Sequence, residues 1–354
     1  MNKLEKVRAH LRAMQIDALF VTSELNQRYL LDYAFTDGML VITAEKAYMV
    51  TDFRYYEEAQ SKANPAFEVV MPSPRIPFVT DVLKKAEAKT VGFESATLSY
   101  DEYMHLKDIY GEFSFVSVGN LFSKVREVKT AEELADMAKA QSITDMAFAH
   151  ILKTMTPTMT EIEVALELEF FMRKNGADGL AFETIAVSGS ASALPHGKPR
   201  NIPLQKGFLT MDYGASYNGY CSDMTRTIVI GKADADMKHL YETVLSAQRQ
   251  GLAAVRAGVS GQSVDTVARD IIDATEYKGC FGHSLGHGVG LFIHESPRIS
   301  QSGTQLLEVG NVVTVEPGIY VQGKYGCRIE DMVAVEENGC HNFTASPKEM
   351  IELF

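Results

Sequence analysis

Apolar and polar residues follow helical and strand-like patterns in alternation from residue 3 to residue 110. The predicted helices cover residues 3–14, 53–63 and 100–110, and the predicted strands cover residues 18–23, 38–44, 47–52 and 88–95. The second and third of these strands are close enough to form a hairpin-like pair. Such alternation indicates a small mixed or parallel sheet with helices packed on it. This region contains no glycine-rich phosphate loop.

A polar, charged stretch from Ser123 to Lys129 marks a boundary, and long helices follow it. Thr130 and Glu133 have the spacing of a capping box, which predicts a helix reaching about Thr154. Further helices are predicted at residues 160–175, 242–256 and 263–276. We therefore expect an α+β protein, with an α/β domain over residues 1–123 and a second domain over residues 130–354.

The second domain has a weak internal duplication, visible only in the order of its elements. Each half has helices, then a glycine-flanked histidine segment (LPHGK or GHSLGHG), then a hairpin that carries two acids. The duplication predicts two halves related by a pseudo-twofold axis. Both hairpins would then converge on one cleft, and each would contribute two carboxylates.

The first hairpin carries Asp212 and Asp223. Asn218-Gly219 is a strong signal for a two-residue type I′ turn, which places Asp212 opposite Thr225 and Gly214 opposite Asp223. Because side chains alternate with period 2, both acids then lie on one face, at a diagonal spacing of about 7–8 Å. The alternative is a pair of solvated acids. The small neighbours on that face favour a site, and Gly214 would leave room for metal ions.

The second hairpin carries Glu316 and Glu330. An apolar run from residue 312 to 315 ends at Glu316-Pro317, because proline cannot donate to a sheet ladder. Arg328 and Glu330 share a face by period 2, so the guanidinium would orient that carboxylate. Asp331 points to the other face and is expected to be structural. Taken alone, this segment is equally consistent with a surface Arg–Glu pair.

Three of the nine histidines lie within twelve residues, at His283, His287 and His294. Glycines on both sides of them make a regular helix improbable and favour a strand or an irregular segment. We take His287 as the metal ligand. His196 and His294 are candidates for substrate contact or proton transfer.

Four acids and one imidazole favour two divalent cations, since four negative charges match two such ions. Oxygen and nitrogen ligands of this kind suit Mn, Co, Fe or Zn. The formal net charge of −12 argues against a nucleic-acid partner. No segment has the length and apolar character of a signal peptide or a membrane span. The four cysteines, none in a CxxC pair, are expected to be free thiols in the cytoplasm.

The ligand set Asp212, Asp223, His287, Glu316 and Glu330 resembles that of the dinuclear metallopeptidases of the pita-bread fold. The matching segments are MDYGASYNGYCSDMTRT, GHSLGHGVGL, HESP, VEPGIY and RIED, within residues 130–350. The segment VTDFRYYEEA resembles the creatinase-type domain that precedes the catalytic domain in Xaa-Pro peptidases. Methionine aminopeptidases normally lack that domain.

The resemblance implies an exopeptidase that hydrolyses the Xaa-Pro bond at a free amino terminus, in a chain that is commonly a homodimer. Two metal ions, usually Mn, would hold a bridging hydroxide that attacks the carbonyl before proline. Glu316 would transfer the proton, while His283 and His294 would stabilise the oxyanion or the leaving group. His196 would assist, and Arg328 would be a neighbouring substrate-side or orienting residue.

Three alternatives stay open. One is a methionine aminopeptidase-like or broader aminopeptidase specificity, and another is a non-catalytic peptide-binding module on the same fold. The third concerns chain length of the substrate, because a dipeptidase needs a cation for the substrate carboxylate. Arg298, four residues after His294, is the candidate, although it is equally consistent with a surface arginine.

Overall fold

The computed structural model describes residues 2–354 and divides the chain into two compact units. The first unit extends to Arg126 and the second begins at Glu127. Helix α6 (Leu121–Glu127) occupies most of the polar stretch expected as a boundary, so the division falls inside a helix. Within the described residues, no helix combines the length and the apolar character that crossing a membrane requires.

The amino-terminal unit is built on one mixed sheet in the order β4-β3-β2-β1-β5-β6. Its strands are β1 (Ala18–Val21), β2 (Met39–Thr43), β3 (Ala47–Val50), β4 (Glu68–Val70), β5 (Thr90–Phe93) and β6 (Ser114–Ser117). The pairs β1–β2 and β2–β3 are antiparallel and the other three pairs are parallel. The mixed sheet and the hairpin-like pair are therefore confirmed, while β4 and β6 were missed.

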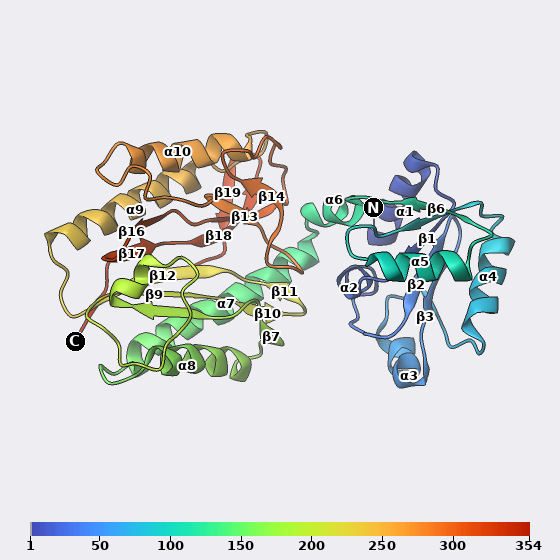
Figure 1. The fold of residues 1–354 in the computed structure, drawn as a ribbon, viewed down its shortest axis with the longest axis horizontal. Helices are drawn as coiled ribbons and strands as arrows, with labels where there is room; N and C mark the ends of the chain where they lie inside the picture. The colour runs from blue at the N-terminus through green and yellow to red at the C-terminus, as the bar shows by residue number, and fades with distance from the viewer. Residues whose placement is uncertain (1) are drawn as a thin grey trace. The chain divides into compact units, whose positions relative to one another are not determined.

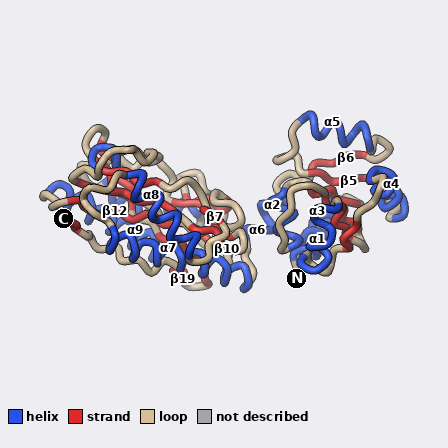
Figure 2. The backbone as a smooth tube through the Cα atoms, turned by 90° about the horizontal axis from the view of Figure 1, so that it is seen from below, coloured by secondary structure: helices blue, strands red, loops and turns tan. Residues whose placement is uncertain are grey.

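Helices cover this sheet and close its core (Figure 2). They are α1 (Lys3–Met14), α2 (Glu24–Leu31), α3 (Phe53–Lys62), α4 (Arg75–Lys85) and α5 (Tyr100–Ile109), and α6 follows the last strand. Phe20, Val41 and Val91 are among the buried side chains of the core. The N-cap residues of α2 and α4, Ser23 and Pro74, make no side-chain cap hydrogen bond. Neither helix was predicted from the sequence.

Four long helices flank the strands of the second unit. They are α7 (Ala131–Thr154), α8 (Glu161–Lys174), α9 (Ala235–Ala254) and α10 (Gly261–Asp273). The pairs α7–α8 and α9–α10 lie on opposite sides of the strands (Figure 1). The predicted capping box at Thr130 is present, and Thr160 forms another with Glu163. α9 begins earlier than expected because Asp234 caps it through the backbone N–H of Met237.

The strands of this unit fall into two sets. The first half contains β7 (Gly179–Leu180), β8 (Ile185–Ser188), β9 (Gly207–Tyr213), β10 (Ala215–Tyr217), β11 (Tyr220–Cys221) and β12 (Met224–Ile230). The second half contains β13 (Gly286–Gly288), β14 (Glu295–Ile299), β15 (Val312–Val315), β16 (Gly318–Val321), β17 (Tyr325–Arg328), β18 (Asp331–Glu336), β19 (Gly339–Asn342) and β20 (Glu352–Leu353). The main sheets have the orders β20-β12-β9-β8 and β14-β13-β15-β18-β19.

The two halves repeat the same construction, as the duplication predicted. Thr160 caps α8 and forms a bridge with Pro203, and Ser260 caps α10 and forms a bridge with Leu306. Each half has its own buried apolar cluster. The halves meet where the backbone N–H of Glu330 donates to the carbonyl of Thr225, at 3.1 Å. This seam brings the acid-bearing strands of the two halves together, which is the arrangement of the pita-bread fold.

Candidate metal centre

The hairpin that carries Asp212 and Asp223 has the predicted register. Asn218 and Gly219 have φ values of 47° and 79°, as a type I′ turn requires. Tyr217 pairs with Tyr220, and Asp212 pairs with Thr225. The two acids therefore share one face of the hairpin.

Gly214, opposite Asp223, is needed for a reason other than the one expected. A Cβ atom at this position would lie 1.9 Å from the carbonyl oxygen of Ser222. The glycine therefore permits two backbone segments to approach, and it fixes where the strand carrying Asp223 can lie. The sequence suggested that Gly214 leaves room for a metal ion, but the atoms a Cβ would meet there belong to Ser222 and Ala181, not to the ligand candidates.

The second pair of acids, Glu316 and Glu330, lies between strands, where the chain changes its pairing partner. β15 pairs with β18, whereas β16 pairs with β17, and the chain crosses from one pair to the other at Ile329-Glu330. Glu316 follows β15, and its backbone N–H donates to Leu285. Arg328 and Glu330 do line the same cavity, but among the described residues no hydrogen bond joins them directly. The Arg328 guanidinium instead donates to Asp212 at 2.6 Å, in the other half of the unit.

His287 lies on the short strand β13, as the glycine-rich context predicted, not on a helix. Its Nδ1 atom is 3.1 Å from the carbonyl oxygen of Gly288, which favours a proton on that nitrogen. Burial lowers the pKa of His287 to about 3, so the ring is neutral. Nε2 then presents its lone pair at 3.5 Å from Asp223 and 3.4 Å from Glu316.

The expected ligands converge on one cavity of about 830 Å³. Atoms of Asp223, His287 and Glu330 that could bind a metal lie within 4.8 Å of one another. Asp212 and Glu316 line the same cavity. All five residues that the sequence suggested as metal ligands are therefore gathered in one place.

Three acids of this cluster, Asp223, Glu316 and Glu330, resist ionisation in the absence of cations. Burial, followed by the neighbouring carboxylates, raises the pKa of Asp223 and of Glu330 well above its usual range. Burial likewise raises the pKa of Glu316 to about 8. Clustered buried acids of this kind require either shared protons or bound cations.

The donor set fits divalent cations. Among the described residues, Oδ1 of Asp212 is buried and has no hydrogen-bond donor. Nε2 of His287 faces two carboxyl groups, so either a carboxyl proton or a bound cation has to satisfy its lone pair. A cation satisfies all of these acceptors at once. Oxygen and imidazole ligands are those that Mn, Co, Zn and Fe accept in proteins.

Residues that were not predicted from the sequence orient the ligand candidates, or the arginine beside them, through hydrogen bonds. Thr225 donates from its hydroxyl to Glu330 at 2.7 Å, and Thr314 donates to Glu316 at 3.1 Å. Tyr320 accepts a hydrogen bond from Arg328 at 2.7 Å. The threonines could have been found, because each lies two residues from a predicted ligand on a strand. Tyr320 carried no such signal.

His283 lines the cavity, as the sequence suggested, but its ring also binds neighbouring protein groups. Its Nδ1 atom is 2.8 Å from the carbonyl oxygen of Ser284, and its Nε2 atom is 3.0 Å from the hydroxyl of Tyr320. Both ring nitrogens are therefore engaged within the protein. Burial and the charge of Arg328 lower the pKa of His283 to about 4, so the ring is neutral. This geometry supports Tyr320 and leaves no nitrogen free for a substrate.

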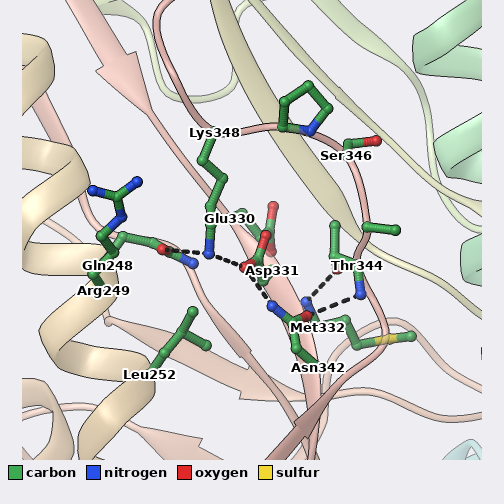
Figure 3. A network of polar contacts seen from close by, with 12 residues as sticks. Gln248, Arg249, Leu252, Glu330, Asp331, Met332, Asn342, Thr344, Ser346 and Lys348 are labelled. Carbon is green, nitrogen blue, oxygen red and sulfur yellow. Dashed lines mark hydrogen bonds and ion pairs between the residues drawn. The ribbon is translucent and has the colours of Figure 1, made fainter.

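A buried polar network lies behind Glu330 (Figure 3). The carboxylate of Asp331 accepts from Lys348 at 2.6 Å, from Asn342 at 2.8 Å and from Arg226 at 2.8 Å. Arg226 also donates to the backbone carbonyls of Thr225 and Glu330. Asp331 therefore has a structural role, as expected from the sequence: its carboxylate is held by three donors, and the residue is not among those that line the cavity. The network joins the two halves at the seam beside the acids.

The remaining candidates stand on the wall of the cavity. His196, His294 and Arg298 all line it. The rings of His294 and His287 are 4.5 Å apart between centroids, and burial together with the charge of Arg298 lowers the pKa of His294. Arg328 also lines the cavity, but its guanidinium is occupied by protein acceptors. Apolar side chains complete the wall, including Leu166, Leu180, Phe182, Ile185 and Ile293.

Comparisons with known proteins agree with this site. Residues 135–337 match the model of metallopeptidase family M24, and residues 3–128 match the creatinase/prolidase N-terminal domain. The chain is 36% identical to an Xaa-Pro dipeptidase of Pyrococcus furiosus, over 99% of each chain.

Solved structures give the same result. A structure of an Xaa-Pro dipeptidase from Bacillus anthracis is 41% identical, with a TM-score of 0.95 over 99% of each chain. A structure of an X-Pro aminopeptidase from Thermotoga maritima is 33% identical, with a TM-score of 0.92 over 98% of this chain and 100% of that chain. The fold and the site thus define a metallopeptidase of the pita-bread class. The chain belongs to metallopeptidase family M24 and carries a creatinase/prolidase-type N-terminal domain.

Proposed function

We propose that this protein is a metal-dependent exopeptidase that hydrolyses the Xaa-Pro bond at the free amino terminus of short peptides. The observation that carries this proposal is the single cavity that gathers five metal-ligand candidates with His196, His294 and Arg298. The relatives named as Xaa-Pro dipeptidases and X-Pro aminopeptidases support the same reaction.

Asp212, Asp223, His287, Glu316 and Glu330 would hold two divalent ions, with manganese as the proposed metal. Such ions, when bound, act as Lewis acids and lower the pKa of a coordinated water. The chain's contribution is to fix the carboxylates. Arg328 orients Asp212, and Thr225 orients Glu330, so neither carboxylate has to reorganise on binding an ion.

We assign proton transfer to Glu316 and stabilisation of the developing negative charge to His294. Glu316 faces the cavity and accepts from Thr314 through Oε1, so its other oxygen is available to take a proton from the attacking water. His294 is neutral near pH 7 because its pKa is lowered, and a neutral imidazole offers one N–H to a developing oxyanion. We assign His196, which also lines the cavity, to contact with the substrate.

Proline as the second residue fits the cavity. The nitrogen of an Xaa-Pro bond carries no hydrogen, so a peptidase that binds its substrate through the N–H of the scissile bond loses that hydrogen bond. Here the apolar wall formed by Leu180, Phe182, Ile185 and Ile293 needs no such donor. Shape and apolar contact would select the pyrrolidine ring and the side chain before it.

Arg298 suggests that dipeptides are among the substrates. Its Cα pairs with that of His287 across β13 and β14, so it stands beside the ligand cluster. The side chain is exposed and lines the cavity, unlike the committed guanidinium of Arg328. A guanidinium in this position can bind the substrate carboxylate in a bidentate manner.

Turnover and metal content test the proposed reaction. The purified protein is assayed on Xaa-Pro dipeptides and Xaa-Pro-Yaa tripeptides with added Mn or Co. Two ions per chain and hydrolysis of either substrate are expected, and Asp223→Ala should lose both. Absence of turnover with every metal, despite two bound ions, would falsify the reaction. Absence of bound ions would favour the non-catalytic module.

Substrate length is tested through Arg298. We expect Arg298→Ala to raise KM for Xaa-Pro at least tenfold and to leave Xaa-Pro-Yaa nearly unchanged, because only the dipeptide places its carboxylate there. Arg256→Ala is the matched control, since Arg256 is exposed and does not line the cavity. Equal effects on both substrates would show that Arg298 does not read the carboxylate.

Methionine removal is the second candidate activity, and a Met-Ala-Ser peptide tests it directly. The creatinase/prolidase-type domain over residues 3–128 favours the Xaa-Pro reaction over this one. The homodimer and the cytoplasmic location expected from the sequence stay predictions. Sedimentation velocity on the purified chain tests the first.

A further inference from the structure

One loop of the cavity wall is anchored at both ends. Residues 195–199, which include His196, line the cavity. At the start of the loop, the carbonyl of Pro195 accepts from Arg328 at 3.3 Å. At its end, Arg200 binds Glu161, the first residue of α8. The stretch that lines the cavity is therefore held between two buried polar groups, the Arg328 guanidinium and the Glu161 carboxylate.

The anchor at Glu161 is unusually complete. The side chain is fully buried, and its two oxygens accept five hydrogen bonds. Ser188 donates from its backbone N–H and its hydroxyl, each at 2.7 Å. Arg200 donates from its backbone N–H at 2.9 Å and from its guanidinium at 2.8 and 2.5 Å. Burial raises the pKa of Glu161, but the bonds from Arg200 and Ser188 outweigh it, so the pKa is lowered and the group stays charged.

Helix capping does not explain Glu161. Thr160 and Glu163 already form the capping box of α8, with both reciprocal hydrogen bonds present. Glu161 instead turns its carboxylate inward, toward β8 and the end of the loop. Its partners are residues 27 and 39 positions away in the chain. The contact is thus tertiary and directed at the cavity wall.

The other half of the unit shows what happens without this carboxylate. The spacing His-x-x-Pro-Arg occurs at His196–Arg200 and again at His294–Arg298. Position 161, the first of α8, corresponds to Gly261, the first of α10. A Cβ atom at Gly261 would lie 2.1 Å from the carbonyl oxygen of Arg298, so no glutamate fits there.

The two arginines consequently differ in what they face. Arg298 has no glutamate at the start of α10 and lines the cavity, whereas Arg200 is bound to Glu161 and is not among the lining residues. The segment that ends at Arg200 is therefore fixed by Glu161, whereas the segment that ends at Arg298 has its arginine at the cavity. The two halves of the duplicated fold therefore differ at the cavity: one contributes an arginine to its lining and the other does not.

We propose that Glu161 is a positioning residue for substrate binding: through Arg200 and Ser188 it fixes the loop that presents His196 to the cleft. The expected effect on substrate binding rests on the proposed function. The immobilisation of the loop is a property of the chain itself. Glu161 is not among the residues that line the cavity, so it acts on the reaction through the groups it holds, of which the loop with His196 is the one proposed here.

Hydrogen exchange tests the immobilisation without any substrate. Glu161→Gln is compared with wild type by mass spectrometry of peptides covering residues 194–201, with peptides covering β9 as an internal reference. We expect at least tenfold faster exchange at 194–201 and no change at β9. Glu163→Gln, two residues along the same helix, is the matched control and should not affect 194–201. Arg200→Lys keeps one donor and should give a smaller effect.

Kinetics test the route through His196. Glu161→Gln should raise KM for an Xaa-Pro substrate several-fold at unchanged metal content. In the His196→Ala background it should add nothing, because residues acting through one contact are not additive. Unchanged exchange at 194–201, or fully additive effects on KM, would overturn the proposal. If the wild type hydrolyses no Xaa-Pro substrate, the proposed function fails, and the exchange experiment still decides the anchor.

Discussion

Arg328 connects more parts of the site than any other side chain described above. It donates to Asp212, to the hydroxyls of Thr225 and Tyr320, and to the carbonyl of Pro195. A planar guanidinium with five donors can satisfy these directions together, whereas a lysine ammonium on a flexible stem cannot. Arg328 therefore orders one metal-ligand candidate and one cavity loop at the same time.

We accordingly expect Arg328→Lys to weaken metal binding. Removing a group that orients a ligand typically costs about 10–100-fold in metal affinity. Competition with a chelator, followed by the metal content of the desalted protein, measures the change. Arg249→Lys serves as the control, since Arg249 binds Glu349 on the surface. Affinity within twofold of wild type would show that Asp212 is ordered without Arg328.

Glu161 gives a prediction that depends on pH. Its folded pKa is lowered relative to the ordinary value of 4.5, so ionised Glu161 stabilises the fold above pH 4.5. The contribution is lost as the pH falls through the lower folded value. Glu161→Gln should therefore reduce the free energy of unfolding at pH 7 by about 1–3 kcal/mol, as expected for hydrogen bonds to a charged group.

That difference should shrink as the pH falls below about 4.5. Urea unfolding of the wild type and Glu161→Gln, at pH 7 and pH 4 with chelator present, measures both values. The chelator removes metal loss as a competing cause. A difference that stays constant between the two pH values would mean that the carboxylate charge does not stabilise the fold.

The hairpin from Gly207 to Ile230 shows how much of an element the sequence determines. The Asn218-Gly219 turn was sufficient to predict which residues pair and which acids share a face, because a two-residue turn fixes the register. The hairpin was predictable because all of its determinants are local. The positions of His287 on a strand and of Asp331 in a structural network followed from equally local patterns.

The second acid pair was predicted less well for a physical reason. Period 2 relates side chains only while a strand keeps its partner, and the chain changes partners between Arg328 and Asp331. The partners of Arg328 come from segments up to 133 residues away in the chain. Tyr320 was missed as well: it binds Arg328 across the β16–β17 hairpin and His283 from a segment 37 residues away. Nothing in the local sequence specifies such contacts.

Gly214 gives a test of the hairpin as an element. A methyl group there would meet the carbonyl of Ser222 at 1.9 Å, so the backbone beside Asp223 has to move. We expect Gly214→Ala to lower stability by about 1–3 kcal/mol, the usual cost of overpacking, and to weaken metal binding. Gly339→Ala, in another hairpin with nothing within 4 Å, is the control. Thermal unfolding and chelator competition on both variants measure the effects.

If Gly214→Ala binds metal with wild-type affinity despite reduced stability, the hairpin tolerates displacement of Asp223. The close backbone approach at Gly214 would then serve folding alone. If neither property changes, Ser222 relaxes without cost, and the local backbone is softer than its hydrogen bonds to Ala215 suggest.

At the scale of the whole molecule, the chain has two compact units with separate cores, and every metal-ligand candidate belongs to the second. A ligand that binds only the folded state stabilises it by RT ln(1 + [L]/Kd), which is about 2.7 kcal/mol at one hundred times Kd. Mn should therefore stabilise the second unit directly, with no direct effect on the first.

Hydrogen exchange during thermal or urea unfolding separates the two units. With Mn in excess over chelator, the amides of β9 and β12 should become exposed at a higher temperature or urea concentration than without it. The amides of β1 and β5 should respond less. Asp223→Ala is the control, because it removes a ligand candidate and should abolish the shift in β9 and β12. An equal shift in both sets of strands would mean that the units unfold as one cooperative body, since metal binding to the second would then stabilise the first as well.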